Sequence, residues 1–196
     1  MFNLAAFIGY MVAVTFTPGP NNILVMTNAG TYGFKKTLNY MMGGAIGVLL
    51  IVAASTYFNV VLFDVIPTVK PFMGIAGAAY MTYLALRIIR SKPPEAGESG
   101  DPLKFHYGFI MQFLNPKLLI FAVTVTSNFI VPYFESSYYV PFTLLITTNF
   151  ILSWVVWAIF GSVFKRFLNK YYKPFNIAMG LILIYSAISI SGLTQI

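Results

Sequence analysis

Long apolar runs separated by short polar segments dominate the pattern along this chain of 196 residues. An α-helix needs about 20 mostly apolar residues to cross a hydrocarbon core of about 30 Å, and six of the runs approach or exceed that length. The sequence therefore predicts an all-α integral membrane protein with six transmembrane helices. These spans are expected at residues 4–28, 40–62, 71–90, 105–131, 140–164 and 174–193.

The polar segments divide the chain into two halves of similar length. The most polar segment, SKPPEAGESGDPLK at 91–104, is rich in proline and glycine and has three predicted spans on either side. An odd number of spans per half requires the halves to enter the membrane in opposite directions, which is the outline of an inverted-topology repeat. We expect a single transmembrane domain over 1–196, made of repeats at 1–91 and 105–196 with a cytoplasmic linker at 92–104.

Composition agrees with a membrane protein and argues against other classes. Hydrophobic residues make up 58% of the chain and charged residues only 9%, whereas a soluble domain is about half apolar and about a quarter charged. The formal net charge is +7, but no basic stripe with interleaved aromatic residues is present, so nucleic acid is not an expected partner. The absence of cysteine excludes disulfides and thiolate metal sites. No cofactor, metal site or catalytic residue is expected.

The distribution of basic residues predicts the orientation in the membrane. Ten of the twelve Lys and Arg residues lie in the first, third and fifth connections or at the helix end that precedes the third. These connections are therefore expected to be cytoplasmic under the positive-inside rule, with both termini outside. The N-terminal segment lacks a positive leader and a small-residue cleavage site, so it is expected to be a retained helix.

Two of the predicted spans are interrupted near their middle, and each is the first span of its half. The first interruption is Thr-Pro-Gly-Pro-Asn-Asn at 17–22, and the second is Asn-Pro-Lys at 115–117. Proline lacks an N–H and clashes with the carbonyl one turn earlier, and irregular backbone is tolerated at membrane depth only inside protein or beside a wet cavity. Paired interruptions in matching positions are typical of the binding site of a secondary transporter.

A lysine inside the second interruption adds a full charge at membrane depth. Insertion of such a charge costs about 2.5–3.5 kcal/mol, so Lys117 requires a partner or water. No acidic residue lies inside a predicted span, and the N-termini of half-helices suit an anionic group such as a carboxylate. We therefore predict that the two interruptions share a hydrated substrate site. Its predicted residues are Pro18, Gly19, Pro20, Asn21, Asn22, Asn115, Pro116 and Lys117. The alternatives are a turn or re-entrant kink without a ligand role at 18–22, and a Lys117 that snorkels to the cytoplasmic interface.

Four further polar residues are candidates for proton coupling or for lining the transport path. They are Asp64, Gln112, Asn128 and Asn149. The alternative for Asp64 is a solvated charge in an outer loop, and the alternative for the amides within apolar spans is ordinary hydrogen bonding between helices. Gly43, Gly44 and Gly47 form a small-residue face that lets helices approach closely, either within one chain or in a homodimer.

The two interrupted segments resemble those of the lysine exporter (LysE/RhtB) family of amino-acid efflux proteins. The resemblance extends to Gly-Ala-Ala-Tyr at 77–80 and Met-Gln-Phe-Leu-Asn at 111–115. TPGPNNIL at 17–24 and VTVTSNFIVP at 123–132 are most similar to the cysteine and O-acetylserine exporter branch. The resemblance implies export of a neutral or cationic amino acid across the bacterial inner membrane by proton antiport.

Other functions stay open beside amino-acid export. A passive small-solute channel or a scaffold subunit is compatible with interrupted helices, which also occur in channels. An intramembrane enzyme needs a nucleophile with a base, or a metal constellation, within the membrane. The chain has one His, no Cys and no acid inside a predicted span, so that alternative has little support. The expected partners are membrane lipid, a small amino acid and the proton.

Overall fold

The computed structural model describes residues 2–90, 103–163 and 171–191, without the side chains of 60–71 and of a few other positions in the helices that contain 60–90 and 172–191. All regular elements in the described ranges are helices. They are α1 Leu4–Phe16, α2 Pro20–Tyr32, α3 Phe34–Tyr57, α4 Asn59–Arg90, α5 Phe105–Phe113, α6 Pro116–Val125, the π-helix η1 Thr126–Ile130, the 3-10 helix η2 Ser136–Tyr138, α7 Tyr139–Val163 and α9 Tyr172–Ser191.

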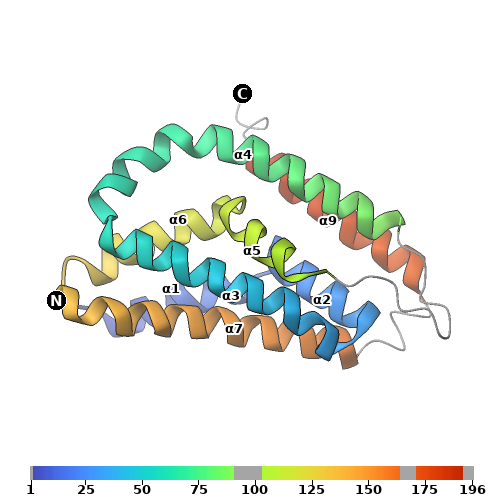
Figure 1. Cartoon of the computed structure of the whole chain (residues 1–196), viewed down its shortest axis with the longest axis horizontal. Coiled ribbons are helices and arrows are strands. Elements are labelled where there is room, and N and C mark those ends of the chain that lie inside the picture. The colour runs from blue at the N-terminus through green and yellow to red at the C-terminus, as the bar shows by residue number, and fades with distance from the viewer. Residues whose placement is uncertain (1, 91–102, 164–170, 192–196) are drawn as a thin grey trace.

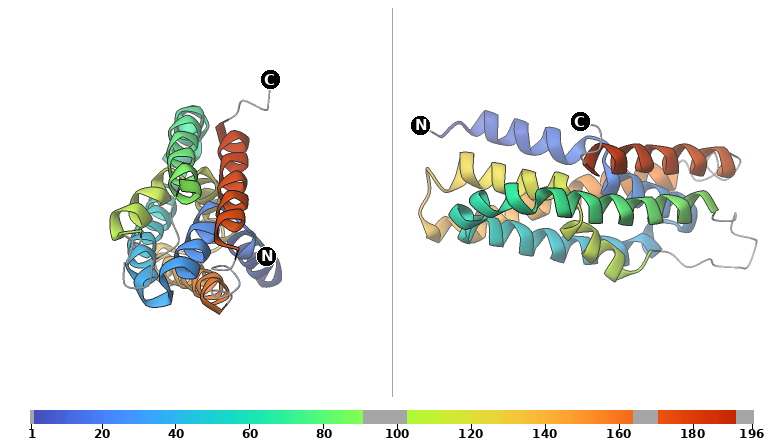
Figure 2. Two further views of the ribbon diagram at one scale, coloured as in Figure 1. Left: turned by 90° about the vertical axis from the view of Figure 1, so that its right-hand side faces the viewer. Right: turned by 90° about the horizontal axis from the view of Figure 1, so that it is seen from above.

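The helices form an elongated bundle with a core group and an outlying pair (Figure 1). In the core group, α2 packs along α7, and α3 packs against both α5 and α7. The outlying pair is formed by α4 and α9, which run side by side along one flank of the bundle in every view (Figure 2). The most extensive packed pairs, α4 with α9, α3 with α5, α2 with α7 and α3 with α7, each join helices from different halves of the chain, so the halves are interleaved.

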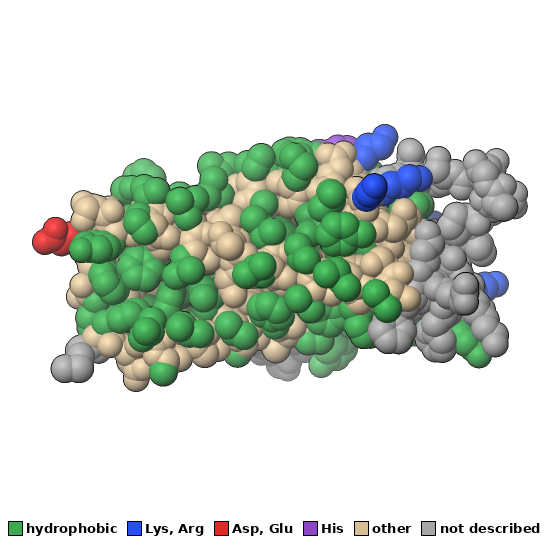
Figure 3. Space-filling model, turned by 90° about the horizontal axis from the view of Figure 1, so that it is seen from below, with side chains coloured by type: hydrophobic (Ala, Val, Ile, Leu, Met, Phe, Trp, Pro, Cys, Tyr) green, Lys and Arg blue, Asp and Glu red, His purple; other side chains and the backbone are tan. Residues whose placement is uncertain are grey.

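The length and apolarity of several helices suit a membrane. Within the described residues, α3 and the stretch Ser136–Val163 are long and apolar enough to cross a bilayer. The pair formed by α5 and Pro116–Ile130 is bent by 61° and counts as a third span if it is taken as one broken helix. Apolar side chains are spread along the whole face seen in Figure 3, where the basic side chains gather at one end of the molecule. Six spans in two inverted repeats stay a prediction.

The described backbone shows that the prediction of one connection was wrong. The sequence predicted a loop at 63–70, whereas α4 runs without a break from Asn59 to Arg90 and is separated from the end of α3 by a single residue. Pro67 and Pro71 lie within α4, whose first part is curved before it runs straight beside α9 (Figure 1). A proline in a helix removes one backbone hydrogen bond and bends the helix without having to end it, and neighbouring groups can compensate.

The other spans agree more closely with the expected positions. The helices α5, α6 and η1 together cover 105–130, α7 covers 139–163 and α9 covers 172–191, all close to their predicted ranges. The α3 helix begins at Phe34 rather than at 40, because Gly33 with φ 91° ends α2 and turns the chain directly into α3. The predicted linker at 92–104 lies outside the described residues apart from its last two.

Close backbone contacts hold the core group together. On α3, Gly43 lies against the carbonyl of Phe105 in α5, and Gly108 of α5 lies against the carbonyl of Tyr40 in α3. A side chain at either glycine would overlap the facing backbone, so the two helices can approach this closely only through glycine. This part of the small-residue face therefore packs helices within one chain, and the homodimer stays a prediction.

Candidate substrate site

The first interruption separates α1 from α2, as the prolines predicted. The last turn of α1 leaves backbone carbonyls without helical partners. The amide nitrogen of Asn22 donates hydrogen bonds to two of them, the carbonyl oxygens of Thr15 at 2.8 Å and Thr17 at 2.9 Å. The extended Gly19 precedes α2, and Pro20 occupies its first position, where a missing N–H costs nothing. Asn22 thus closes the break, and its side-chain oxygen stays available as an acceptor.

The second interruption separates α5 from α6 and is built in the same way. The residue before the new helix is again extended, and Pro116 again occupies the first helical position. Here Asn115 caps the helix, because its side-chain oxygen accepts a hydrogen bond from the backbone N–H of Lys117 at 3.1 Å. Gly19 provides no such cap to α2. The start of α2 therefore keeps backbone donors that no side-chain cap satisfies.

The two interruptions meet through the ammonium group of Lys117. Its Nζ donates hydrogen bonds to the hydroxyl of Thr17 at 3.0 Å and to the carbonyl oxygen of Thr17 at 3.3 Å. A Cβ added at Gly19 would lie 3.1 Å from the same nitrogen. The positive charge of Lys117 therefore sits beside the uncapped start of α2, which carries a partial positive charge of its own. This arrangement favours an anionic group between them.

A cavity opens at the meeting point of the two interruptions. It encloses about 320 Å³ of space, a figure that includes open solvent at its mouth. No acidic residue is among the described residues that line it. The lining residues are Val14, Thr15, Gly19, Pro20, Asn21, Asn22, Asn115, Lys117, Leu118, Phe121, Phe150 and Trp154.

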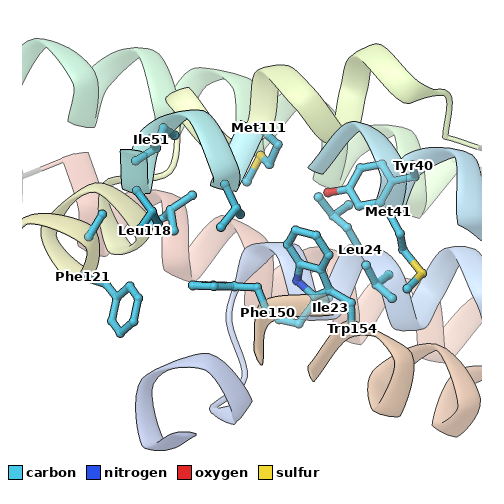
Figure 4. Packing of buried hydrophobic residues seen from close by; sticks show 14 of the residues in the cluster. Ile23, Leu24, Tyr40, Met41, Ile51, Met111, Leu118, Phe121, Phe150 and Trp154 are labelled. Carbon is cyan, nitrogen blue, oxygen red and sulfur yellow. The ribbon is translucent and has the colours of Figure 1, made fainter. Parts of the chain in front are cut away.

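One side of the cavity is apolar and mostly aromatic. Phe150 and Trp154 project from α7 and lie between side chains of α2 and those of α6 (Figure 4). Phe121 of α6 meets Phe150 edge to face, with ring centroids 5.4 Å apart, an arrangement that aromatic pairs prefer. The cavity therefore combines a cationic, polar side at the interruptions with an aromatic wall, as small-ligand sites commonly do.

A buried hydrogen-bond network fixes the start of α2 in place. The amide nitrogen of Asn21 donates to the side-chain oxygen of Gln112 at 2.7 Å, and the hydroxyl of Tyr40 donates to the Asn21 oxygen at 3.1 Å. Gln112 in turn donates to the carbonyl of Gly108 at 2.8 Å. The network joins α2, α3 and α5, so the side chain of Asn21 serves to position the helix start. Gln112 lies behind the cavity and does not line it.

The structure places two of the other residues that were predicted to line the transport path or to couple protons. Asn149 donates to the hydroxyl of Thr15 at 2.8 Å and so makes the hydrogen bond between helices that the sequence left as an alternative. Asn128 is exposed and donates to the carbonyl of Thr124 in its own turn, and it does not line the cavity. The side chain of Asp64 lies outside the described part of the chain.

Six of the eight residues predicted from the interruptions line the cavity, while Pro18 is exposed and Pro116 is buried nearby. Their role in substrate binding stays a prediction. Sequence reasoning did not single out Thr17, although its place next to Pro18 was a signal. It also did not find the aromatic wall, because aromatic residues make up 17% of the chain and no periodicity distinguishes those two or three.

Comparisons with known proteins point to one family. The family model described as LysE type translocator matches residues 12–191. The cysteine/O-acetylserine efflux proteins of Escherichia coli K12 and Shigella flexneri are each 33% identical to this chain, and that of E. coli O157:H7 is 34% identical. Each match covers 190 residues, which is 95% of this chain and 96% of the relative. No solved structure matches the chain.

Proposed function

This chain belongs to the LysE family of translocators, and on that premise we propose that it exports small neutral amino acids of the cysteine and O-acetylserine class across the bacterial inner membrane. The proposed mode is secondary active transport, with the proton as the coupling ion in antiport. The two halves of the chain would rock against each other around the cavity. The orientation follows the positive-inside rule, with both termini outside.

The single observation that carries the proposal is the pairing of Lys117 with the uncapped start of α2. An amino acid brings a carboxylate, which would accept hydrogen bonds from the ammonium of Lys117 and from free backbone N–H groups of α2. The side-chain oxygen of Asn22 is an acceptor that suits the substrate ammonium. The apolar wall beside Phe121 and Phe150 suits a short, uncharged side chain.

Alternating access follows from which parts of the chain surround the cavity. Lys117 belongs to the second half and Thr17 to the first, so their hydrogen bonds of 3.0 and 3.3 Å tie the two halves together at the site. A bound carboxylate would compete with Thr17 for the ammonium and weaken this tie. Binding of substrate would thereby favour movement of one half against the other. Asp64 is the candidate for carrying the coupling proton.

The test is amino-acid uptake into inside-out membrane vesicles, where export appears as uptake. Lys117→Ala removes the ammonium that is proposed to pair with the substrate carboxylate, and loss of one partner of a hydrogen-bonded charge pair enclosed in a binding site costs about 2–5 kcal/mol. Uptake of O-acetylserine at low concentration should therefore fall about 30-fold or more. The matched control is Lys36→Ala at the exposed start of α3, which should transport normally. Full transport by a folded Lys117→Ala variant would disprove the site.

The same vesicles separate a transporter from a channel. With an imposed pH gradient, the wild-type protein should accumulate O-acetylserine above its external concentration. A channel would only equalise the two concentrations whatever the gradient. Accumulation that persists after the pH gradient is collapsed would rule out the proton as the coupling ion.

A further inference from the structure

Trp154 is a large residue that lines the cavity from α7 and is only 1% exposed. Its position is set by a glycine on the neighbouring helix. The Cη2 and Cζ3 atoms of the indole lie 2.8 and 2.9 Å from the point that a Cβ would occupy at Gly44 of α3. The benzene edge of the ring therefore fills the space that the missing side chain leaves, and this fixes the direction of the pyrrole edge.

The indole nitrogen of Trp154 is buried and has no hydrogen-bond partner within the described chain. Indole Nε1–H can only donate, and the large majority of buried side-chain polar atoms have a hydrogen-bond partner, so an unpartnered buried indole N–H is unusual. In Figure 4 the nitrogen lies on the side of the ring that faces Phe150, another residue of the cavity wall. A phenyl face is at best a weak acceptor for an N–H group.

The three asparagines of the cavity each use at least one side-chain atom in hydrogen bonds within the protein. Asn21 uses its nitrogen with Gln112 and its oxygen with Tyr40. Asn22 uses its nitrogen to close the first interruption, and Asn115 uses its oxygen to cap α6. Among the side chains described at the cavity, Trp154 thus contributes a donor that the protein itself does not use.

We propose that Trp154 is a substrate-binding residue, whose indole N–H donates a hydrogen bond to an oxygen of the bound amino acid. This inference rests on the proposed transport of amino acids and adds a second donor to the ammonium of Lys117. A zwitterionic amino acid has two carboxylate oxygens, and O-acetylserine has an ester carbonyl as a further acceptor. The nitrogen is covered in the present state, so the substrate reaches it when the movement of the two halves widens the cavity.

The chain offers a direct optical test, because it contains only two tryptophans. Trp157 lies one turn further along α7, does not line the cavity and contacts Phe160. The variant Trp157→Phe therefore leaves Trp154 as the sole tryptophan, and Trp154→Phe leaves Trp157. Titration of purified Trp157→Phe protein with O-acetylserine should change its tryptophan fluorescence in a saturable way. Trp154→Phe protein should show no such change.

Transport by the same two variants completes the test. Trp154→Phe should raise the KM for O-acetylserine about tenfold, which corresponds to 1.4 kcal/mol, and Trp157→Phe should leave it unchanged. A wild-type KM in Trp154→Phe, or an unchanged fluorescence in a Trp157→Phe variant that transports, would overturn the role of Trp154. If Trp154→Phe does not fold, the fluorescence titration of Trp157→Phe by itself tests the role of Trp154. Absence of transport by the wild-type protein would instead refute the proposed function.

Discussion

The contact between α3 and α5 gives a sharp prediction, because glycine can be replaced with alanine both where it packs against a neighbouring helix and where it faces open space. Gly43→Ala adds a methyl group that would meet the backbone of α5, with the carbonyl carbon of Phe105 at 2.8 Å and the amide nitrogen of Phe109 at 3.1 Å. Gly9→Ala adds the same group to exposed α1, where nothing lies within 4 Å. The neighbour of Gly43 is backbone, so relief requires the two helices to move apart.

The magnitude follows from the difference between the two sites. Replacing glycine with alanine inside a helix stabilises by about 0.5–1 kcal/mol through the backbone alone, and this gain is common to both variants. Overpacking of a tight core costs about 1–3 kcal/mol and applies to Gly43 only. Gly43→Ala should therefore unfold about 1–3 kcal/mol more easily than Gly9→Ala. For a chain of this size the difference corresponds to about 2–12 °C in melting temperature.

The assay is thermal unfolding of the purified variants in the same detergent, followed by intrinsic fluorescence. Gly9→Ala should melt at or slightly above the wild-type temperature, and Gly43→Ala about 2–12 °C below Gly9→Ala. Separation of α3 from α5 also disturbs Gln112, so the weaker variant should lose transport in parallel. Equal melting temperatures for the two variants would refute the close packing of α3 on α5.

Two further substitutions test the polar side of the cavity. Gly19→Ala introduces no backbone strain, because the φ of −158° is open to any residue, but its methyl group lies 3.1 Å from the nitrogen of Lys117. The melting temperature of Gly19→Ala should stay unchanged, while its KM for O-acetylserine rises about tenfold, which corresponds to 1.4 kcal/mol. An unaltered KM in vesicle transport would contradict the placement of the ammonium. Gln112→Leu leaves the buried amide of Asn21 without its acceptor, which costs about 1–3 kcal/mol. Thermal unfolding should register this loss, and wild-type stability would speak against the hydrogen bond.

The chemical character of the chain and the positions of its two helix interruptions were available from the sequence alone. Apolar runs of helical length predicted a membrane protein of helices, because the bilayer allows few other solutions. The interruptions at Pro18 and Pro116 were predictable as well, since a proline cannot complete the helical hydrogen bonds around it. Lys117 was predicted to be functional because a charge at membrane depth needs a partner, and that role stays a prediction. Each of these conclusions depends on local chemistry within a few residues.

Tertiary packing decided which residues the interruptions meet and what each one does there. Thr17 and Lys117 are joined by a hydrogen bond although they lie 100 positions apart in the chain, and no local sequence pattern predicts such a pair. Asn22 proved to close a break in its own vicinity, and α4 continues through a segment whose prolines and charges indicated a loop. The orientation of Trp154 depends on the missing side chain of Gly44 on another helix. Local sequence specifies where a helix is interrupted, whereas the identity of facing side chains depends on the register and separation of packed helices, which exist only once the chain has folded.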